Sequence, residues 1–186
     1  MKLRKEKLRN QSELTVRQYV KKFETAVGVE NLPIDYFEKN HTVVFRDDQN
    51  RILAGYCLVT KELRGFKVAQ ISLPEHLSKN DFFEINGVFI SKKVKSKLFR
   101  IRYWSSILLD ILKKCRGKKL LLWYNYDNLY LRKLYRCINA RQILIGSNSK
   151  ESKVKSHSNL FVGYQSQPYL VNALMKSALF YLKKAA

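Results

Sequence analysis

The chain is 186 residues long, which corresponds to one domain, and it carries 36 Lys and Arg against 15 Asp and Glu, a formal net charge of +21. Hydrophobic residues make up 46% of it and aromatic residues 12%. A chain with this much apolar content can bury enough surface to offset the entropy lost on folding. The composition therefore excludes a disordered basic tail. The charge indicates an acidic partner, and nucleic acid, an anionic membrane surface, an acidic protein and a phosphorylated cofactor all satisfy it.

The first part of the chain predicts a helix followed by a hairpin. Residues 1–12 are basic, and we expect them to be a solvated extension of a single domain over residues 13–186. Apolar residues at helical spacing predict a helix over Glu13–Val27. Two β-rich runs, Thr42–Phe45 and Ile52–Thr60, lie on either side of a polar turn and predict a β-hairpin.

Two further strands are predicted in the next stretch. Apolar and aromatic residues indicate a strand over Phe66–Leu73, which Pro74 ends. The following strand is predicted over Phe82–Ile90, and Gly87 interrupts it. A glycine inside a strand often marks a bulge or a close approach of another group to the backbone.

The second half alternates helices and strands. The period near 3.6 predicts a helix over Leu98–Cys115, and Gly117 stands where a left-handed C-terminal cap is expected. The apolar run inside Lys119–Tyr126 is typical of a strand buried on both faces. The remaining elements are a helix, a strand, a serine-rich loop, a strand and a C-terminal helix that Pro168 opens: Asn128–Ile138, Gln142–Ile145, Gly146–Ser158, Asn159–Tyr164 and residues from 168 onward. This order predicts an α/β fold, a mixed sheet with a right-handed βαβ crossover.

The cysteines and histidines indicate neither disulfides nor a metal site. The three cysteines lie in separate apolar stretches without the C-x-x-C spacing, so we expect reduced thiols and a cytoplasmic protein. The three histidines are scattered along the chain, and we expect no bound metal. The charged N-terminus lacks the apolar core of a signal peptide, and no stretch approaches the roughly 18 apolar residues of a membrane-spanning helix.

Three local patterns over Thr42–Tyr164 together resemble one known family. They are the hairpin VFRDDQNRILAGYCLV, the strand FFEINGVFI that leads into the helix RIRYWSSILLDILKK, and the run LWY followed by Asn128, with Leu131, Leu134 and Tyr135 three, six and seven positions later. In these patterns the chain resembles the GNAT N-acyltransferase superfamily. The resemblance implies a GNAT-like α/β fold, a mixed and mostly antiparallel sheet with splayed central strands, flanked by helices.

The resemblance also implies the reaction. GNAT enzymes move an acyl group from a thioester to an amine, so we expect transfer of an acetyl to fatty acyl group to a primary amine of a peptide, amino acid or other small molecule. The donor is acyl-CoA, or an acyl-phosphopantetheine borne by an acyl carrier protein. No metal and no side-chain nucleophile is needed, because the neutral amine attacks the thioester directly.

The donor site is expected at the helix that follows the strand with Gly87. The family's phosphate-binding turn, Gln or Arg, two residues, Gly, one residue, then Gly or Ala, aligns with Arg100–Ser105, where Arg100 is retained and Tyr103 and Ser105 replace the glycines. Amide groups at a helix N-terminus bind phosphate, but bulky residues limit the approach of a pyrophosphate. The donor-binding residues implied are Lys95, Lys97, Arg100, Arg102, Tyr103, Ser105 and Asn128.

Residues 91–102 contain six basic residues in twelve, immediately ahead of and within this predicted turn. They suit the phosphates of coenzyme A, and equally the acidic surface of an acyl carrier protein, whose arm presents a single phosphate. A solvated run of charges is the alternative interpretation. After the Tyr, the family's Gly-Phe appears as Asn139-Ala140, and Asn also accepts the left-handed conformation.

Two side chains and one backbone segment are candidates for the chemical step. Glu84, at the start of its strand, matches the carboxylate that serves as general base in family members, and a surface Glu is the alternative. Tyr135 matches the Tyr that assists the leaving thiolate, and a core aromatic is the alternative. The oxyanion donors are expected among the backbone amides of the three residues after Gly87, namely Val88, Phe89 and Ile90.

Two other functions remain open. The first is a catalytically inactive GNAT-like domain that binds nucleic acid, favoured by the charge of +21 and by aromatics interleaved with basic residues, such as Tyr126 and Arg132. We expect such binding to be weak and nonspecific. The second is a protein that lies on a membrane surface through its C-terminal helix, whose apolar stripe ends in Lys183-Lys184.

Overall fold

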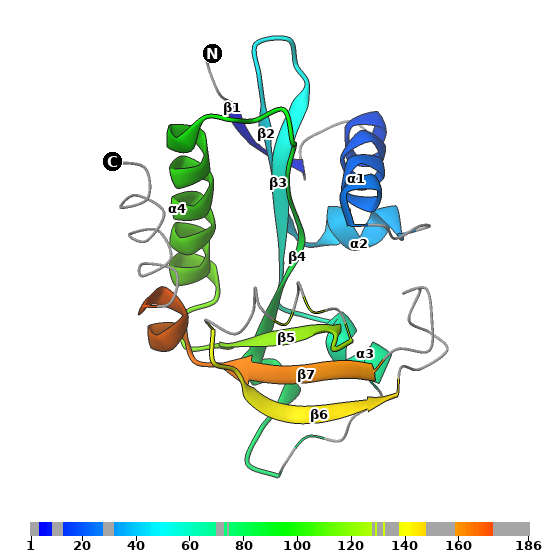
Figure 1. The fold of residues 1–186 in the computed structure, drawn as a ribbon, viewed down its shortest axis with the longest axis vertical. Helices are drawn as coiled ribbons and strands as arrows, with labels where there is room; N and C mark the ends of the chain where they lie inside the picture. Colours follow the sequence, from blue (N-terminus) through cyan, green and yellow to red (C-terminus); the bar gives the residue numbers. More distant parts are fainter. Residues whose placement is uncertain are drawn as a thin grey trace. The chain divides into compact units, whose positions relative to one another are not determined.

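The computed structural model describes residues 4–8, 13–27, 32–69, 73, 75–127, 129, 132, 138–147 and 159–172. Its strands are β1 (Arg4–Lys7), β2 (His41–Arg46), β3 (Ile52–Val59), β4 (Phe82–Ile90), β5 (Lys119–Asn125), β6 (Arg141–Ser147) and β7 (Asn159–Gln165). They form one seven-stranded sheet in the order β1-β2-β3-β4-β5-β7-β6 (Figure 1). Four pairs of neighbours are antiparallel, whereas β4 and β5 are parallel. The prediction of a mixed, mostly antiparallel α/β sheet is confirmed.

The helices are α1 (Glu13–Val27), α2 (Ile34–Lys39), α3 (Arg64–Ala69) and α4 (Lys97–Lys114), with a 3-10 turn η2 (Lys79–Asp81) and helical residues at 167–172. The chain divides into two compact units. The first comprises Met1–Val59 and Ile85–Ile107, and the second comprises Thr60–Glu84 and Leu108–Ala186. Both β4 and α4 continue from one unit into the other. No helix among the described residues is long and apolar enough to span a membrane.

In the first unit, helices pack on both faces of β2 and β3. Helices α1 and α2 contact one face (Figure 1), where the Tyr19 ring of α1 lies against Gly55. The next residue of β3, Tyr56, points to the opposite face and packs edge-on against Tyr103 of α4, with ring centroids 5.9 Å apart. Alternation of side chains along a strand therefore gives this unit two aromatic layers.

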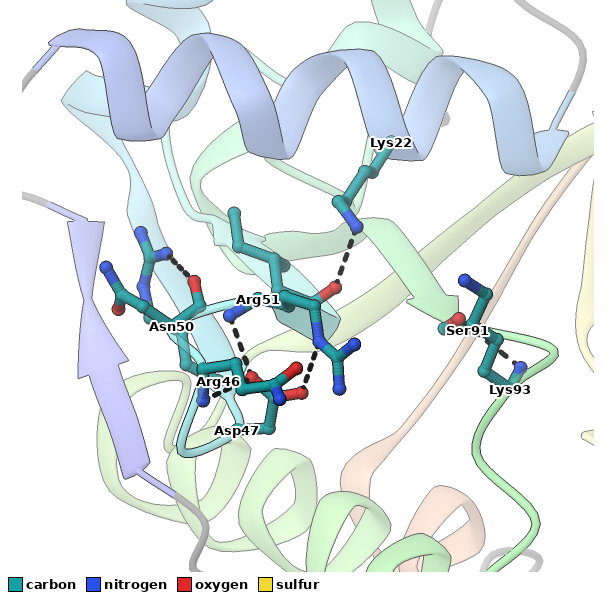
Figure 2. Close-up of polar contacts among 9 residues, drawn as sticks. Lys22, Arg46, Asp47, Asn50, Arg51, Ser91 and Lys93 are labelled. Atoms are coloured by element: carbon teal, nitrogen blue, oxygen red, sulfur yellow. Dashed lines mark hydrogen bonds and ion pairs between the residues drawn. The ribbon is translucent and has the colours of Figure 1, made fainter.

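The turn between β2 and β3 is held by buried charges that have partners. The Asp47 carboxylate accepts hydrogen bonds from the backbone amides of Gln49 and Arg51. It also forms an ion pair with the Arg51 guanidinium at 2.7 Å (Figure 2). Backbone and side-chain hydrogen bonds from Arg51 lower the pKa of Asp47 below its ordinary value, against the opposing effect of its desolvation. Arg46, whose side chain is 4% exposed, donates to the Asn50 carbonyl and pairs with Glu6 at 3.1 Å.

The N-terminal segment that contains Glu6 differs from the prediction. Residues 1–12 were expected to be a solvated extension, but Arg4–Lys7 forms strand β1 and pairs antiparallel with β2. The segment is too polar for its pattern to indicate a strand. Its pairing depends on the edge of β2 and on Glu6 meeting Arg46, and both are tertiary contacts.

In the second unit, β5, β7 and β6 pair antiparallel, and β5 begins parallel to the start of β4 through Phe82↔Lys119 and Phe83↔Leu120. The parallel β4–α4–β5 order confirms the predicted βαβ arrangement. The splaying of β4 from β5 that the family resemblance implies stays a prediction.

The strand predicted over Phe66–Leu73 is wrong, because Arg64–Ala69 forms helix α3. Its aromatic and β-branched residues favour a strand, yet Phe66 is buried edge-on against Phe82 of β4, with ring centroids 5.4 Å apart. The Glu84 carboxylate also accepts the first amides of α3. Packing and capping together override the local preference.

Most other predicted elements agree with the structure where it describes them, but Gly146 and Ser147, predicted to begin the loop Gly146–Ser158, are the last residues of strand β6. The helix Glu13–Val27 and the strand Phe82–Ile90 are confirmed to the residue. Gly117, three residues after the end of α4, has φ +77°, as expected of a left-handed cap. The helix predicted over 128–138, the loop over 148–158 and the chain after residue 172 lie almost entirely outside the described residues.

Both described cysteines are buried, and we expect them to resist thiol reagents. Desolvation raises the pKa of the Cys115 thiol to about 11, although Lys118 and Lys114 oppose the rise. Folded protein at pH 8 should leave Cys57 and Cys115 unlabelled by iodoacetamide, and both should react after unfolding, as peptide mass spectrometry would show. Because the folded pKa is raised, the contribution of Cys115 to stability is complete below about pH 9 and is lost as the pH approaches 11. Fast labelling of Cys115 at pH 8 would contradict its burial.

Candidate active site

The connection from β4 to α4 forms a capped, strongly basic loop, Ser91–Ser96, which we call the basic loop. Its first residue turns the chain, because the Val94 amide donates to the Ser91 carbonyl and the Lys93 amide to the Ser91 hydroxyl (Figure 2). Its last residue, Ser96, caps α4 by accepting the Phe99 amide at 3.2 Å. Val94 is buried and anchors the loop to the first unit.

Charged side chains surround this helix N-terminus. The exposed cations of the basic loop and of the first turns of α4 are Lys92, Lys93, Lys95, Lys97, Arg100 and Arg102. The Arg100 guanidinium is directed back to the loop and donates to the Val94 carbonyl at 3.4 Å. Cations at a helix N-terminus add to the positive end of the helix dipole, so the loop attracts anions.

The structure moves the expected phosphate-binding turn. Residues 100–105 lie inside α4, and the strand-to-helix turn is the basic loop instead. The alignment to Arg100–Ser105 was based on Arg100, the one family residue that is retained. Ser96, which precedes the apolar pair Leu98-Phe99, is a helix-start signal and would have located the turn correctly. The basic loop contains no glycine either.

Tyr103 lies in the interior of the first unit. It is fully buried, and its hydroxyl donates to the Gly55 carbonyl of β3 at 2.7 Å. Burial raises the pKa of Tyr103 well above its ordinary value, Tyr56 adds to the rise, and a hydrogen bond with the Phe89 backbone opposes it. The Tyr103 hydroxyl thus bridges β3 and β4. Ser105, by contrast, is exposed on the outer face of α4.

Gly87 has the backbone conformation expected of a bulge in β4. Its φ is +64°, in the left-handed region that strands avoid. A Cβ atom at this position would lie 2.1 Å from the Tyr19 hydroxyl oxygen and 3.1 Å from the Phe37 ring. Glycine is therefore required both by the backbone conformation and by the neighbours. We call Gly87 and Val88 the β4 kink.

The three amides proposed as oxyanion donors differ in their surroundings. The Phe89 amide engages the Tyr103 hydroxyl, and its side chain is buried against Tyr19. Val88 and Ile90 are half-buried. The assignment of these amides as donors stays a prediction, and Val88 is the amide that the β4 kink contains.

Glu84 lies in the second unit, at the boundary within β4. It is 1% exposed, and its carboxylate accepts the Gly65 amide at 2.6 Å and the Arg64 amide at 3.2 Å. The expectation of a surface Glu is thereby excluded. These hydrogen bonds fix the carboxylate at the start of α3, and its role as general base stays a prediction.

Two predicted site residues, Asn128 and Tyr135, lie outside the described residues. Asn139, just beyond them, has φ +48°, as expected of the residue that replaces the family's glycine. Within the described part of the chain, no cluster of three or more His, Cys, Asp or Glu residues could hold a metal ion. Sequence reasoning missed Tyr19, because nothing in its local pattern distinguishes it from an ordinary core residue.

No protein-family model and no curated protein matches the sequence. Solved structures do match. FeeM, an N-acyl amino acid synthase from uncultured soil microbes, aligns with a TM-score of 0.60 at 12% identity, over 90% of this chain and 93% of that one. An N-acetyltransferase from Staphylococcus aureus Mu50 aligns with a TM-score of 0.56 at 10% identity, over 90% and 99%.

The spermidine N-acetyltransferase of Vibrio cholerae aligns with a TM-score of 0.55 at 12% identity, over 91% of this chain and 96% of that one. At such low identity the likeness concerns the fold. It extends over nearly the whole of each chain, and the sheet order with its parallel β4–α4–β5 segment agrees with it. The chain has the fold of the GNAT N-acyltransferases.

Proposed function

We propose that this chain is an N-acyltransferase that transfers an acyl group from a thioester to a primary amine. The observation that carries the proposal is the β4–α4 segment, in which the strand contains a glycine in the left-handed conformation and a lysine-rich loop leads into a capped helix N-terminus. Such a segment offers one amide to a carbonyl oxygen and a cationic helix end to a phosphate. The fold shared with N-acetyltransferases and an N-acyl amino acid synthase supports it.

The reaction then follows from the chemistry of the groups. The neutral amine attacks the thioester carbonyl carbon, and the Val88 amide stabilises the oxyanion that forms. The amine loses a proton, for which Glu84 is the proposed acceptor, directly or through water. The C–S bond breaks, and the departing thiolate takes a proton, for which Tyr135 is the proposed donor. The acceptor is a peptide, an amino acid or another small amine.

The basic loop favours a protein-bound donor. A free coenzyme A presents a pyrophosphate, which glycines normally let the backbone approach, and the loop has none. An acyl carrier protein presents one phosphodiester and an acidic surface. Beside the lysines, Leu98 is 63% exposed and Ile101 38% exposed, so the surface offers apolar contacts as well as charge. Acyl-CoA remains the alternative donor, and a cytoplasmic location stays a prediction.

Reversal of charge in the basic loop tests this choice. In Lys93→Glu/Lys95→Glu, kcat/KM with an octanoyl acyl carrier protein should fall by about tenfold or more at low salt, because charges at the edge of an interface act on the association rate. The difference from wild type should shrink as salt is added. Turnover of octanoyl-CoA should fall less. The matched control is Lys21→Glu/Lys61→Glu, which makes the same change in net charge at exposed positions outside the loop.

Turnover of the two thioesters by the wild-type protein distinguishes the two donors and tests the proposed function itself. If wild-type protein uses octanoyl-CoA efficiently and ignores the carrier protein, the donor is coenzyme A and the loop serves its phosphates. If it cleaves neither thioester in the presence of mixed amino acids and polyamines, the proposed function is wrong. Nanomolar, sequence-selective nucleic-acid binding at physiological salt would then favour the inactive nucleic-acid-binding domain.

A further inference from the structure

Tyr19 is a fully buried residue of α1 whose hydroxyl reaches across to the β4 kink. It donates to the Gly87 carbonyl oxygen at 2.9 Å. Its ring packs edge-on against Phe37, with centroids 5.5 Å apart, and at a tilt of 40° against Phe89, with centroids 5.7 Å apart. The hydroxyl therefore has little freedom to turn elsewhere, and the carbonyl it binds has a fixed direction.

The direction of that carbonyl determines the direction of the next amide. The Gly87 carbonyl and the Val88 N–H belong to one planar peptide group, in which a trans bond makes them point in opposite directions. With the carbonyl held toward α1 by Tyr19, the Val88 N–H points away from α1. A glycine at 87 is otherwise free to rotate this peptide, because it has no Cβ to restrict its φ and ψ angles.

The following amide is fixed from another element. The Phe89 backbone engages the hydroxyl of Tyr103, which donates in turn to Gly55 of β3. Two tyrosine hydroxyls from different helices thus hold the two peptides on either side of Val88. Of the three candidate amides, Phe89 is occupied within the unit, and Val88 is the one whose orientation Tyr19 sets.

We infer that Tyr19 is a positioning residue that orients the Gly87–Val88 peptide so that the Val88 amide acts as the oxyanion donor. The inference rests on the proposed function, since an oxyanion forms only if a thioester carbonyl is attacked. Tyr19 is fully buried and acts on the oxyanion only through this peptide. Its burial, together with Cys57, Tyr103 and Tyr36, raises its pKa well above the ordinary value, so the hydroxyl stays a donor across any assay pH.

The test compares Tyr19→Phe with Tyr56→Phe. Tyr56 is an equally buried tyrosine of the same unit, and its hydroxyl pairs with the Ser106 hydroxyl of α4 at 3.0 Å. Each variant loses one hydroxyl, and each keeps its ring. In Tyr19→Phe, kcat for octanoyl transfer should fall by about tenfold. Complete removal of an oxyanion donor lowers kcat by about 100-fold or more, and a donor that is only misdirected should lower it by less. The KM for the octanoyl acyl carrier protein should stay within about twofold of wild type, as expected when the interaction that is lost is made mainly in the transition state.

A second measurement does not depend on activity. In protein labelled with [15N]valine, the Val88 amide resonance, identified by its absence in Val88→Ile, should shift and exchange faster with solvent in Tyr19→Phe and remain unchanged in Tyr56→Phe. An unchanged Val88 resonance in Tyr19→Phe overturns the inference, even if no thioester is ever cleaved. The inference is also overturned if the Val88 resonance shifts in Tyr19→Phe but kcat of Tyr19→Phe equals that of Tyr56→Phe. In that case the peptide moves without any effect on catalysis. If wild type cleaves no thioester, the proposed function fails and the oxyanion role fails with it.

Discussion

Replacement of Gly87 by Ala should destabilise the protein by about 4 kcal/mol, the sum of a strained left-handed alanine and an overpacked contact. The new methyl group would lie 2.1 Å from the Tyr19 hydroxyl oxygen, and the φ of +64° disfavours any side chain. Urea unfolding followed by tryptophan fluorescence measures the loss. The β4 kink would also be displaced, so acyl transfer should fall by at least the factor expected for Tyr19→Phe.

Gly117→Ala is the matched control for Gly87→Ala. Gly117 has a similar φ of +77°, but a Cβ there would meet no atom within 4 Å. This variant should therefore cost only the conformational strain, about 1 kcal/mol. In the Tyr19→Phe background the Tyr19 hydroxyl, which the new methyl group would approach most closely, is absent. The loss of stability caused by Gly87→Ala should then fall toward that caused by Gly117→Ala. Equal losses for Gly87→Ala and Gly117→Ala would show that Tyr19 does not crowd the kink.

Glu84→Gln should lower both activity and stability. The glutamine keeps one acceptor oxygen, but its amide nitrogen would face a backbone N–H that the carboxylate now accepts, at Gly65 or Arg64. A buried donor left without an acceptor costs about 1–3 kcal/mol. If Glu84 is also the base, kcat near neutral pH should fall by about 100-fold or more, and the acidic limb of the pH–rate profile should disappear.

Gly65→Ala separates the base from the anchor. Its Cβ would lie 2.7 Å from Trp123 Cδ1 and 3.0 Å from a Glu84 carboxylate oxygen, so it disturbs the same cluster but retains the carboxylate group. The acidic limb should survive in Gly65→Ala and vanish in Glu84→Gln. If the two variants lose stability and activity in parallel and both keep the limb, Glu84 anchors α3 and is not the base.

The sequence by itself determined the elements whose signals are local. Helix α1 was predicted to its end residues because its apolar period is uninterrupted, and β4 because its aromatic and β-branched run is bounded by polar residues. Gly87, Gly117 and Asn139 were predicted to be special because few other residues adopt a positive φ. The order of these elements predicted a mixed α/β sheet, and the three local patterns over Thr42–Tyr164 resembled the family whose fold the chain has.

Only the tertiary structure decided where the site groups point. Arg64–Ala69 became a helix instead of a strand because Glu84, twenty residues away from Arg64, accepts its amides and because Phe66 packs on Phe82. Residues 100–105, predicted as the phosphate-binding turn, lie inside α4, where the buried Tyr103 holds the helix against β3, and the turn between β4 and α4 is the basic loop.

The same holds for Tyr19, which lies 68 residues from the carbonyl it binds. A sequence pattern records which residues are apolar and at what period, but a buried hydroxyl is directed by whichever backbone group the packed fold brings within about 3 Å of it. Such a contact leaves no periodic signal in the chain. The direction of the amide that we propose as the oxyanion donor is therefore set by long-range packing, whereas the glycine before it could be recognised in the sequence.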